Sequence, residues 1–158
     1  MNRPGDEVRI RRMTPGDLER VIEIAQDLKD APHWPRAVYA AALDPEHVPR
    51  RIALVAEDAE TGAGTGFLVA GMVPPQAELE SIAVAAECHR RGIGGRLLAA
   101  MVEELRRKLI QEVFLEVRAS NRTALAFYRA TGFAEAGRRP RYYADPEEDA
   151  VLLNLRLE

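Results

Sequence analysis

The sequence contains one cysteine, three histidines and no long apolar run. The single cysteine, Cys88, cannot form an intrachain disulfide, and no apolar stretch approaches the roughly 20 residues that cross a bilayer. The first residues lack the apolar core of a signal peptide. His33, His47 and His89 do not have the spacing of metal ligands. We therefore expect a cytoplasmic protein without a disulfide, a membrane segment or a metal cofactor.

A strong excess of one charge is also missing. The 158 residues include 22 Lys or Arg and 25 Asp or Glu, a net charge of −3, so direct nucleic-acid binding is not expected. Hydrophobic residues make up 47% and charged residues 30%, as in ordinary globular proteins. The chain contains neither repeats nor a low-complexity linker. We expect one domain over residues 1–158, and the sequence carries no signal for an oligomeric state.

The chain reads as alternating strands and helices. Thr14 as N-cap and Asp17 three residues later are typical of a helix start. Strands are expected over 8–12, 52–57, 66–73, 77–84, 112–118, 133–138 and 150–157. Helices are expected over 15–28, 36–43 and 123–130, with another after the glycines at 92–95. The early strands should form antiparallel hairpins, whereas the two strands that flank the last-named helix should be parallel. This order predicts a mixed α/β sheet and not a doubly wound fold.

The helix that follows the glycines is strongly amphipathic. Its apolar face, expected in the core, consists of Leu97, Leu98, Met101, Val102 and Leu105. Its polar face, expected in solvent, consists of Glu103, Glu104, Arg106 and Arg107.

The glycines themselves lie in the most informative stretch, Cys88-His89-Arg90-Arg91-Gly92-Ile93-Gly94-Gly95-Arg96. Glycines let backbone N–H groups face a ligand without a Cβ in the way, and a helix N-terminus adds partial positive charge. With the neighbouring arginines, this pattern predicts a phosphate or pyrophosphate site. The stretch lacks the first glycine of a dinucleotide fingerprint and the lysine of a Walker A loop. A glycine-rich turn with solvated arginines is the alternative.

A second group of motifs makes the interpretation more specific. Leu115-Glu116-Val117-Arg118-Ala119-Ser120-Asn121 is followed by Ala124, Tyr128 and Gly132-Phe133. With the glycine stretch, which reads H-R-R-G-I-G against the usual Q/R-x-x-G-x-G/A, it resembles the GCN5-related N-acetyltransferase (GNAT) superfamily. Within that superfamily the chain looks most like the bacterial enzymes that acetylate the N-terminal alanine of a ribosomal protein. The resemblance implies a mostly antiparallel seven-stranded sheet with a central splayed parallel pair and about four helices.

The resemblance also implies acetyl-coenzyme A (acetyl-CoA) as the donor. Its pyrophosphate would bind the backbone around Arg90, Arg91, Gly92, Ile93, Gly94 and Gly95. Its pantetheine arm would pair with the backbone of Ile82, Ala83 and Val84 as an added strand. The Asn121 amide would reach the same arm, and the Val84 N–H could polarise the thioester carbonyl. His89 departs from the family's Gln or Arg.

Two side chains are candidates for the chemistry. An α-amine with a pKa of about 7.8 is roughly one-tenth neutral at pH 7, so one carboxylate suffices as its base. Glu116 is that candidate, because a central strand should be covered on both faces, so its carboxylate should be partly desolvated. A purely structural pair with Arg118 is the alternative. Tyr128 is the candidate acid for the departing thiolate; the alternative is an aromatic side chain packed in the core.

The acceptor is less well defined by the sequence than the donor. We expect a primary amine, most simply a protein N-terminus; a small molecule such as a polyamine, amino acid or antibiotic is the alternative. A cofactor-binding regulatory module without turnover is a further alternative of another class. Glu78 with Glu80, and Tyr142 with Tyr143, are candidate acceptor contacts, with a solvated strand face and aromatic pairing as their respective alternatives. Trp34 could line the acceptor entrance or anchor helix packing.

Overall fold

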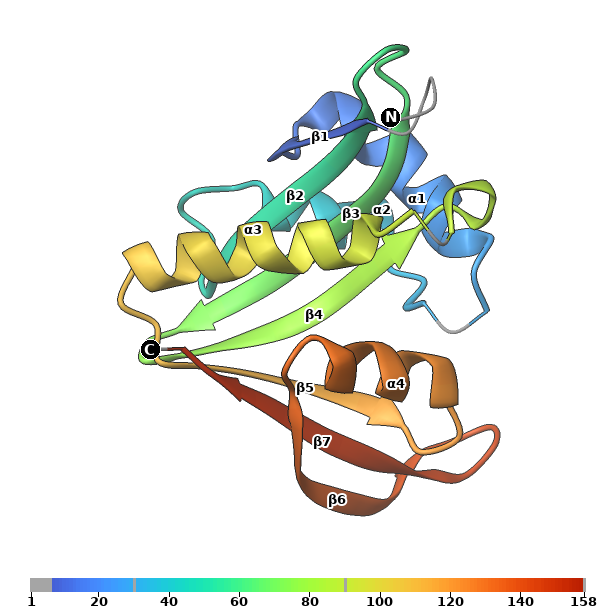
Figure 1. Cartoon of the computed structure of the whole chain (residues 1–158), viewed down its shortest axis with the longest axis vertical. Coiled ribbons are helices and arrows are strands. Elements are labelled where there is room, and N and C mark those ends of the chain that lie inside the picture. The colour runs from blue at the N-terminus through green and yellow to red at the C-terminus, as the bar shows by residue number, and fades with distance from the viewer. Residues whose placement is uncertain (1–6, 30, 90, 158) are drawn as a thin grey trace.

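A computed structural model describes residues 7–29, 31–89 and 91–157. Figure 1 shows a single twisted sheet with helices on both faces. The strands are β1 (Val8–Arg12), β2 (Arg50–Asp58), β3 (Gly64–Val73), β4 (Gln76–Val84), β5 (Glu112–Arg118), β6 (Ala134–Tyr143) and β7 (Glu148–Arg156). The helices are α1 (Leu18–Gln26), α2 (Arg36–Ala42), α3 (Ile93–Arg107) and α4 (Arg122–Ala130), with 3-10 turns at Pro15–Asp17 and Ala86–Cys88. The element order and the mixed sheet predicted from the sequence are confirmed.

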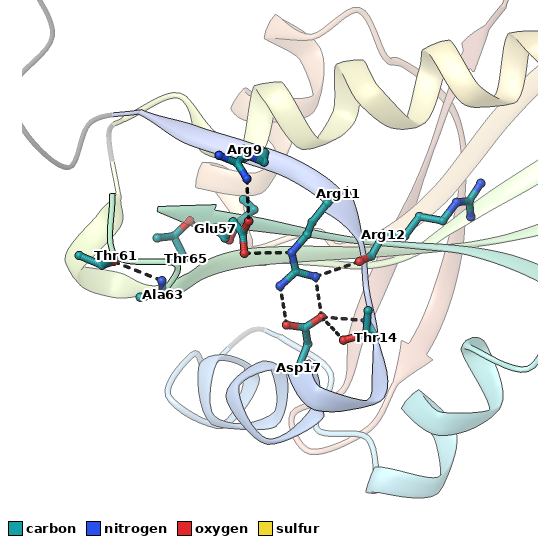
Figure 2. Close-up of polar contacts among 10 residues, drawn as sticks. Arg9, Arg11, Arg12, Thr14, Asp17, Glu57, Thr61, Ala63 and Thr65 are labelled. Atoms are coloured by element: carbon teal, nitrogen blue, oxygen red, sulfur yellow. Dashed lines mark hydrogen bonds and ion pairs between the residues drawn. The ribbon is translucent and has the colours of Figure 1, made fainter. Parts of the chain in front are cut away.

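The first helix begins where the sequence predicts. Asp17 Oδ2 accepts hydrogen bonds from the Thr14 backbone N–H at 2.8 Å and from its hydroxyl at 3.1 Å. The Arg11 guanidinium donates to both Asp17 oxygens at 2.8 Å, as Figure 2 shows. These hydrogen bonds hold the pKa of Asp17 below its usual range, and those from the Arg11 guanidinium have the largest effect. The helix start is therefore tied to the edge strand β1.

The strand order is β1-β2-β3-β4-β5-β7-β6, and every neighbouring pair except β4–β5 is antiparallel. Helices cover both faces of β3. Neighbouring residues on a strand point to opposite faces, so the contacts of Phe67 and Gly66 report on different faces. Phe67 meets Tyr39 of α2, with ring centroids 5.9 Å apart. At Gly66, a Cβ would lie 3.4 Å from the side chain of Ile93 of α3. Thus α2 and α3 lie on opposite faces.

The two halves of the sheet are joined by a short parallel ladder. Strands β4 and β5 pair at three positions only, Gln76 with Glu112, Ala77 with Val113 and Glu78 with Phe114. Beyond them β4 remains paired with β3 as far as Val84, while β5 remains paired with β7. The two strands therefore diverge from one end, as Figure 1 shows. This is the splayed pair that the resemblance implied.

One sequence prediction about α3 is wrong. The apolar face is confirmed, with Leu97 and Met101 fully buried. Glu104, expected in solvent, is only 9% exposed and forms an ion pair with Arg12 of β1. The side of the helix toward β1 is covered by this arginine, and the pair neutralises the buried carboxylate.

No helix in the described part of the chain is both long and apolar enough to cross a membrane.

Candidate active site

One edge of β4 is open at the divergence. Residues 82–84 are in register with 66–68 of β3, whereas β5 pairs with β4 no farther than Glu78 within the described residues. Backbone groups that point away from β3 here have no neighbouring strand in the described chain. An extended ligand with amide groups can pair with such an edge as an added strand. Ile82, Ala83 and Val84, which the resemblance places beside the pantetheine arm, lie on this edge.

The glycine stretch leads from this edge into α3. Gly92 has φ of +73°, a left-handed conformation suited to glycine, and serves as the N-cap without a side-chain hydrogen bond. The first N–H groups of α3, from Ile93 onward, therefore lack a capping side chain. A Cβ at Gly92 or Gly95 would meet no atom within 4 Å, so the space beside the backbone is open there. These features fit an anion such as a pyrophosphate.

Gly94 has a different reason to be glycine. A Cβ at Gly94 would lie 3.1 Å from the ring of Phe127 in α4, which is a tight contact. Glycine therefore allows α4 to approach the start of α3 across the divergence. Its role in packing adds to the predicted role of its N–H.

The charged residues of the stretch are only partly described. Arg90, predicted to bind the cofactor, lies outside the described residues. Arg91 is exposed, and its charge contributes to lowering the pKa of Asp58, after the hydrogen bonds from Thr61 and Glu60. His89 Nε2 lies 2.7 Å from the Val84 carbonyl oxygen and so connects the stretch to the end of β4. The residue that departs from the family pattern thus contacts the strand predicted to hold the donor.

Glu116 lies on β5, and its carboxylate pairs with Arg139 of the edge strand β6. Its Oε1 is 3.4 Å from Arg139 Nε, and its side chain is 19% exposed. Hydrogen bonding and charge interaction with this carboxylate raise the pKa of the Tyr142 hydroxyl. The alternative partner, Arg118, instead pairs with Glu148 at 3.3 Å and lies 4.4 Å from the Tyr143 ring centroid. The predicted carboxylate is therefore partly desolvated, but its cation comes from another strand.

Tyr128 lies on α4 in an aromatic cluster. Its ring packs against Phe127 and Phe133 at centroid distances of 5.3 and 5.5 Å. Burial raises the pKa of its hydroxyl to about 12. The phenol therefore keeps its proton well above neutral pH, as a proton donor must, and core packing and an acid role are compatible here.

Glu116 and Tyr128 belong to opposite faces of the sheet. A Cβ at Gly132, just after α4, would lie 3.3 Å from Leu155, the register partner of Val113. Register partners share a face, so α4 packs on the face of β5 that contains Val113. Glu116 is three residues farther along β5 and points to the other face. The two candidates thus flank β5 from the two sides, beside the divergence.

Two further carboxylates lie on the Glu116 side. Glu80 is bound by Arg51 at 2.9 and 3.3 Å. Burial, and then the charges of Glu80 and Glu116, raise the pKa of Glu78. A surface pocket opens beside them, lined by Pro49, Gly71, Val73, Gln76, Ala77, Glu78, Glu80 and Phe114. The exposed Glu78 and the half-buried Glu80 therefore form one charged surface with Glu116.

Other candidates are placed as follows. The Asn121 Oδ1 accepts a hydrogen bond from the Ala124 N–H at 3.1 Å, so Asn121 caps α4 and leaves its NH2 end for a ligand.

Burial raises the pKa of the Cys88 thiol, which disfavours a reactive thiolate. The Trp34 ring centroid lies 5.2 Å from that of Tyr39, with the rings tilted by 46°, which supports the packing interpretation. The described residues contain no group of three or more His, Cys, Asp or Glu able to hold a metal ion.

Comparison with known proteins agrees with this geometry. Residues 18–133 match the acetyltransferase (GNAT) family model. The chain belongs to the GNAT acetyltransferase family. Members similar to it include the N-alpha-acetyltransferase RimI of Mycobacterium tuberculosis, 34% identical over 94% of this chain and 92% of that one. The fold matches the Escherichia coli ribosomal-protein-S18-alanine N-acetyltransferase with a TM-score of 0.81, 29% identity and coverage of 96% and 95%.

One relative is a much longer protein than this chain. An uncharacterized protein of Mycobacterium leprae is 37% identical over 145 residues, which are 89% of this chain but only 38% of that protein. The chain thus spans well under half the length of this relative.

Sequence reasoning missed one residue at the site. Arg139 belongs to the basic cluster at 138–141, but no motif separates it from its neighbours. Its pairing with Glu116 depends on β6 and β7 folding back beside β5, which local spacing does not reveal.

Proposed function

We propose that this GNAT family member transfers the acetyl group of acetyl-CoA to the N-terminal α-amine of a protein. The observation that carries the proposal is the divergence of β4 and β5, with Glu116 and Tyr128 on the two faces of β5 beside it. A thioester lying in that divergence would be accessible to a base from one face and an acid from the other.

The GNAT family uses acetyl-CoA, and the residues present fit this donor. The uncapped start of α3, with Gly92 to Gly95 and Arg91, suits the pyrophosphate. The open edge of β4 at residues 82–84 suits the amides of the pantetheine arm, and the Asn121 amide lies at the start of α4. When bound, acetyl-CoA supplies an activated acyl group. Arg90 remains a candidate contact from the sequence alone.

Glu116 and Tyr128 together account for the protons that move during the acetyl transfer. The neutral amine nitrogen attacks the thioester carbonyl carbon, forming the C–N bond, and the C–S bond breaks. Glu116 takes the proton that the amine loses, and Tyr128 donates its proton to the departing thiolate. The products are an acetylated amine and free coenzyme A thiol. An α-amine suits a single carboxylate base because about one-tenth of it is already neutral at pH 7, far more than for lysine.

A protein N-terminus is favoured as the acceptor by the similar proteins. The M. tuberculosis relative is named an N-alpha-acetyltransferase, and the E. coli structure is named for the alanine of ribosomal protein S18. The pocket beside Glu78 and Phe114 opens to the surface on the Glu116 side, where residues that follow an N-terminus could lie.

A thiol-release assay tests the proposal. Acetyl-CoA is offered with short peptides that differ in their first residues, with the same peptides N-acetylated, and with polyamines, amino acids and aminoglycosides. We expect thiol release with free α-amines, strongest for small first residues, and none with the blocked peptides. Turnover of a small amine alone would contradict the protein acceptor, and no turnover with any amine would contradict the enzyme assignment.

A further inference from the structure

The cation that meets Glu116 is loosely held. The ion pair joins Arg139 Nε to Glu116 Oε1 at 3.4 Å, a long contact, and the Arg139 side chain is 56% exposed. Its guanidinium carbon also lies 5.4 Å from the ring centroid of Tyr142, a second favourable position for the same cation. The arginine can therefore leave the carboxylate without losing all of its stabilising contacts.

A neighbouring pair on the same surface shows what a fixed ion pair looks like. Arg51 reaches Glu80 with two nitrogens, at 2.9 and 3.3 Å, and both side chains are less than one-fifth exposed. Its Nη1 also lies 3.2 Å from His47 Nδ1 and 3.5 Å from the Pro49 carbonyl oxygen. Four polar contacts therefore hold Arg51, whereas within the described residues Arg139 has one long ion pair and one ring contact.

The backbone that carries Arg139 is also weakly held. Strand β6 is the edge strand and pairs only with β7. Its register shifts between Arg139 and Tyr143, and Arg141 within that interval has φ of +52°. An irregular edge segment can adjust more readily than a central strand, because fewer ladder hydrogen bonds restrain it.

The net charge of this surface stays the same when one cation replaces another. Three carboxylates, Glu78, Glu80 and Glu116, face two arginines, Arg51 and Arg139, so the group has a charge of −1. If Arg139 moves away and one ammonium takes its place, the charge again becomes −1. An ammonium can therefore replace the guanidinium without leaving the carboxylates less compensated.

We infer that Arg139 is a displaceable counter-ion of Glu116, and that the acceptor's ammonium binds by replacing the Arg139 guanidinium at that carboxylate. This inference rests on the proposed function, since it concerns how the amine reaches its base. Arg139 acts here as a positioning residue that orients Glu116 while no amine is present. It follows that Arg139 competes with the acceptor for binding and is absent from the carboxylate during transfer. The bound ammonium releases one proton to solvent to become the neutral amine that attacks, and Glu116 then takes the proton lost in the transfer.

Steady-state kinetics separate this role from a structural one. With a peptide that the wild-type protein acetylates, Arg139→Gln should lower the acceptor KM about two- to five-fold, because a competing exposed ion pair is removed. The kcat and the acetyl-CoA KM should stay unchanged. Arg139→Lys, which keeps the charge, should restore the wild-type acceptor KM. An unchanged or raised acceptor KM in Arg139→Gln, or a fall in kcat, would overturn the inference.

Arg138→Gln provides the matched control. Arg138 precedes Arg139 on β6, but its Nε pairs with Glu135 at 2.9 Å. The substitution removes the same charge from the same strand, so it should leave the acceptor KM at the wild-type value. An equal fall in KM in both variants would show a general charge effect and overturn the specific role.

An NMR titration, which needs no turnover, tests the displacement of Arg139 independently of the proposed function. In protein labelled with 15N-arginine, the Arg139 Nε–H signal is assigned by its loss in Arg139→Lys. Methylammonium chloride should shift this signal saturably, whereas sodium chloride at equal ionic strength should not, and Glu116→Gln should abolish the saturable shift. Equal responses to the two salts would overturn the displacement. If no amine supports thiol release, the proposed function fails, and this titration still decides the exchange at Glu116.

Discussion

Strands β3 and β6 are equally long, at ten residues each, but they are built very differently. Strand β3 lies between β2 and β4 and is buried from Thr65 to Gly71, whereas β6 is the edge strand and is mostly exposed. The first supports the edge of β4 where we place the donor, and the second carries the cation that meets Glu116. The comparison suggests a rigid donor side and an adjustable acceptor side across one divergence.

The largest expected effect comes from removing the candidate base while leaving the packing of both strands intact. Glu116→Gln keeps the size of the side chain but cannot accept the amine proton. We expect kcat/KM to fall about 10²- to 10⁴-fold, the usual contribution of a general base. Thiol release measures the loss, and thermal unfolding should show a fold as stable as the wild type. Full turnover in this variant would contradict the assigned base.

The next effect tests the rigid side directly. Phe67 of β3 is fully buried and contacts Tyr39, so Phe67→Ala should lower the free energy of unfolding by about 3–5 kcal/mol. Arg138→Gln on the exposed strand β6 should change it by less than about 0.5 kcal/mol. Urea unfolding measures both. Comparable losses in the two variants would remove the contrast between β3 and β6.

A smaller effect is expected at the candidate acid. Tyr128→Phe should lower kcat about ten- to a hundred-fold, because a thiolate leaves readily and needs only modest help. Since the pKa of Tyr128 is raised to about 12, its proton is retained throughout the assay range. The ratio of wild-type to variant rates should therefore stay constant from pH 7 to pH 10. Convergence of the two rates by pH 10 would point to a phenol with an ordinary pKa.

The smallest effect concerns the link between β1 and α1. Asp17→Asn should lower the free energy of unfolding by about 1 kcal/mol at pH 7, since it weakens the pairing with Arg11. The pKa of Asp17 is lowered in the folded state, so its stabilisation is present above the ordinary carboxyl pKa and is lost as pH falls through the folded value. The difference between wild type and variant should thus shrink below about pH 4. A constant difference down to pH 2.5 would rule out the ionic contribution.

Much of the fold could be predicted because its signals are local. The order of elements and the helix start at Thr14 follow from short-range periodicity and capping chemistry. The donor side could be predicted for the same reason, since the end of β4, the glycines and the start of α3 are consecutive in the chain.

The rest depended on contacts between distant residues. Periodicity places Glu104 in solvent, because it cannot reveal that Arg12 covers that side of α3. Position on one strand makes Arg118 the obvious partner of Glu116, yet Arg139 comes from β6, which lies beyond β7 in the sheet. Register shifts in β6 decide which of its arginines reaches Glu116, and a regular alternation does not predict such shifts.

The central claim is that acetyl-CoA binds at the divergence, between the open edge of β4 and the start of α3. Titration of acetyl-CoA into 15N-labelled protein, followed by backbone amide NMR, tests it most directly. We predict that the largest saturable shifts occur at residues 82–84 and 92–95, with small changes along β1 and the outer edge of β6. Shifts concentrated elsewhere, or no saturable shift at these amides, would contradict the account.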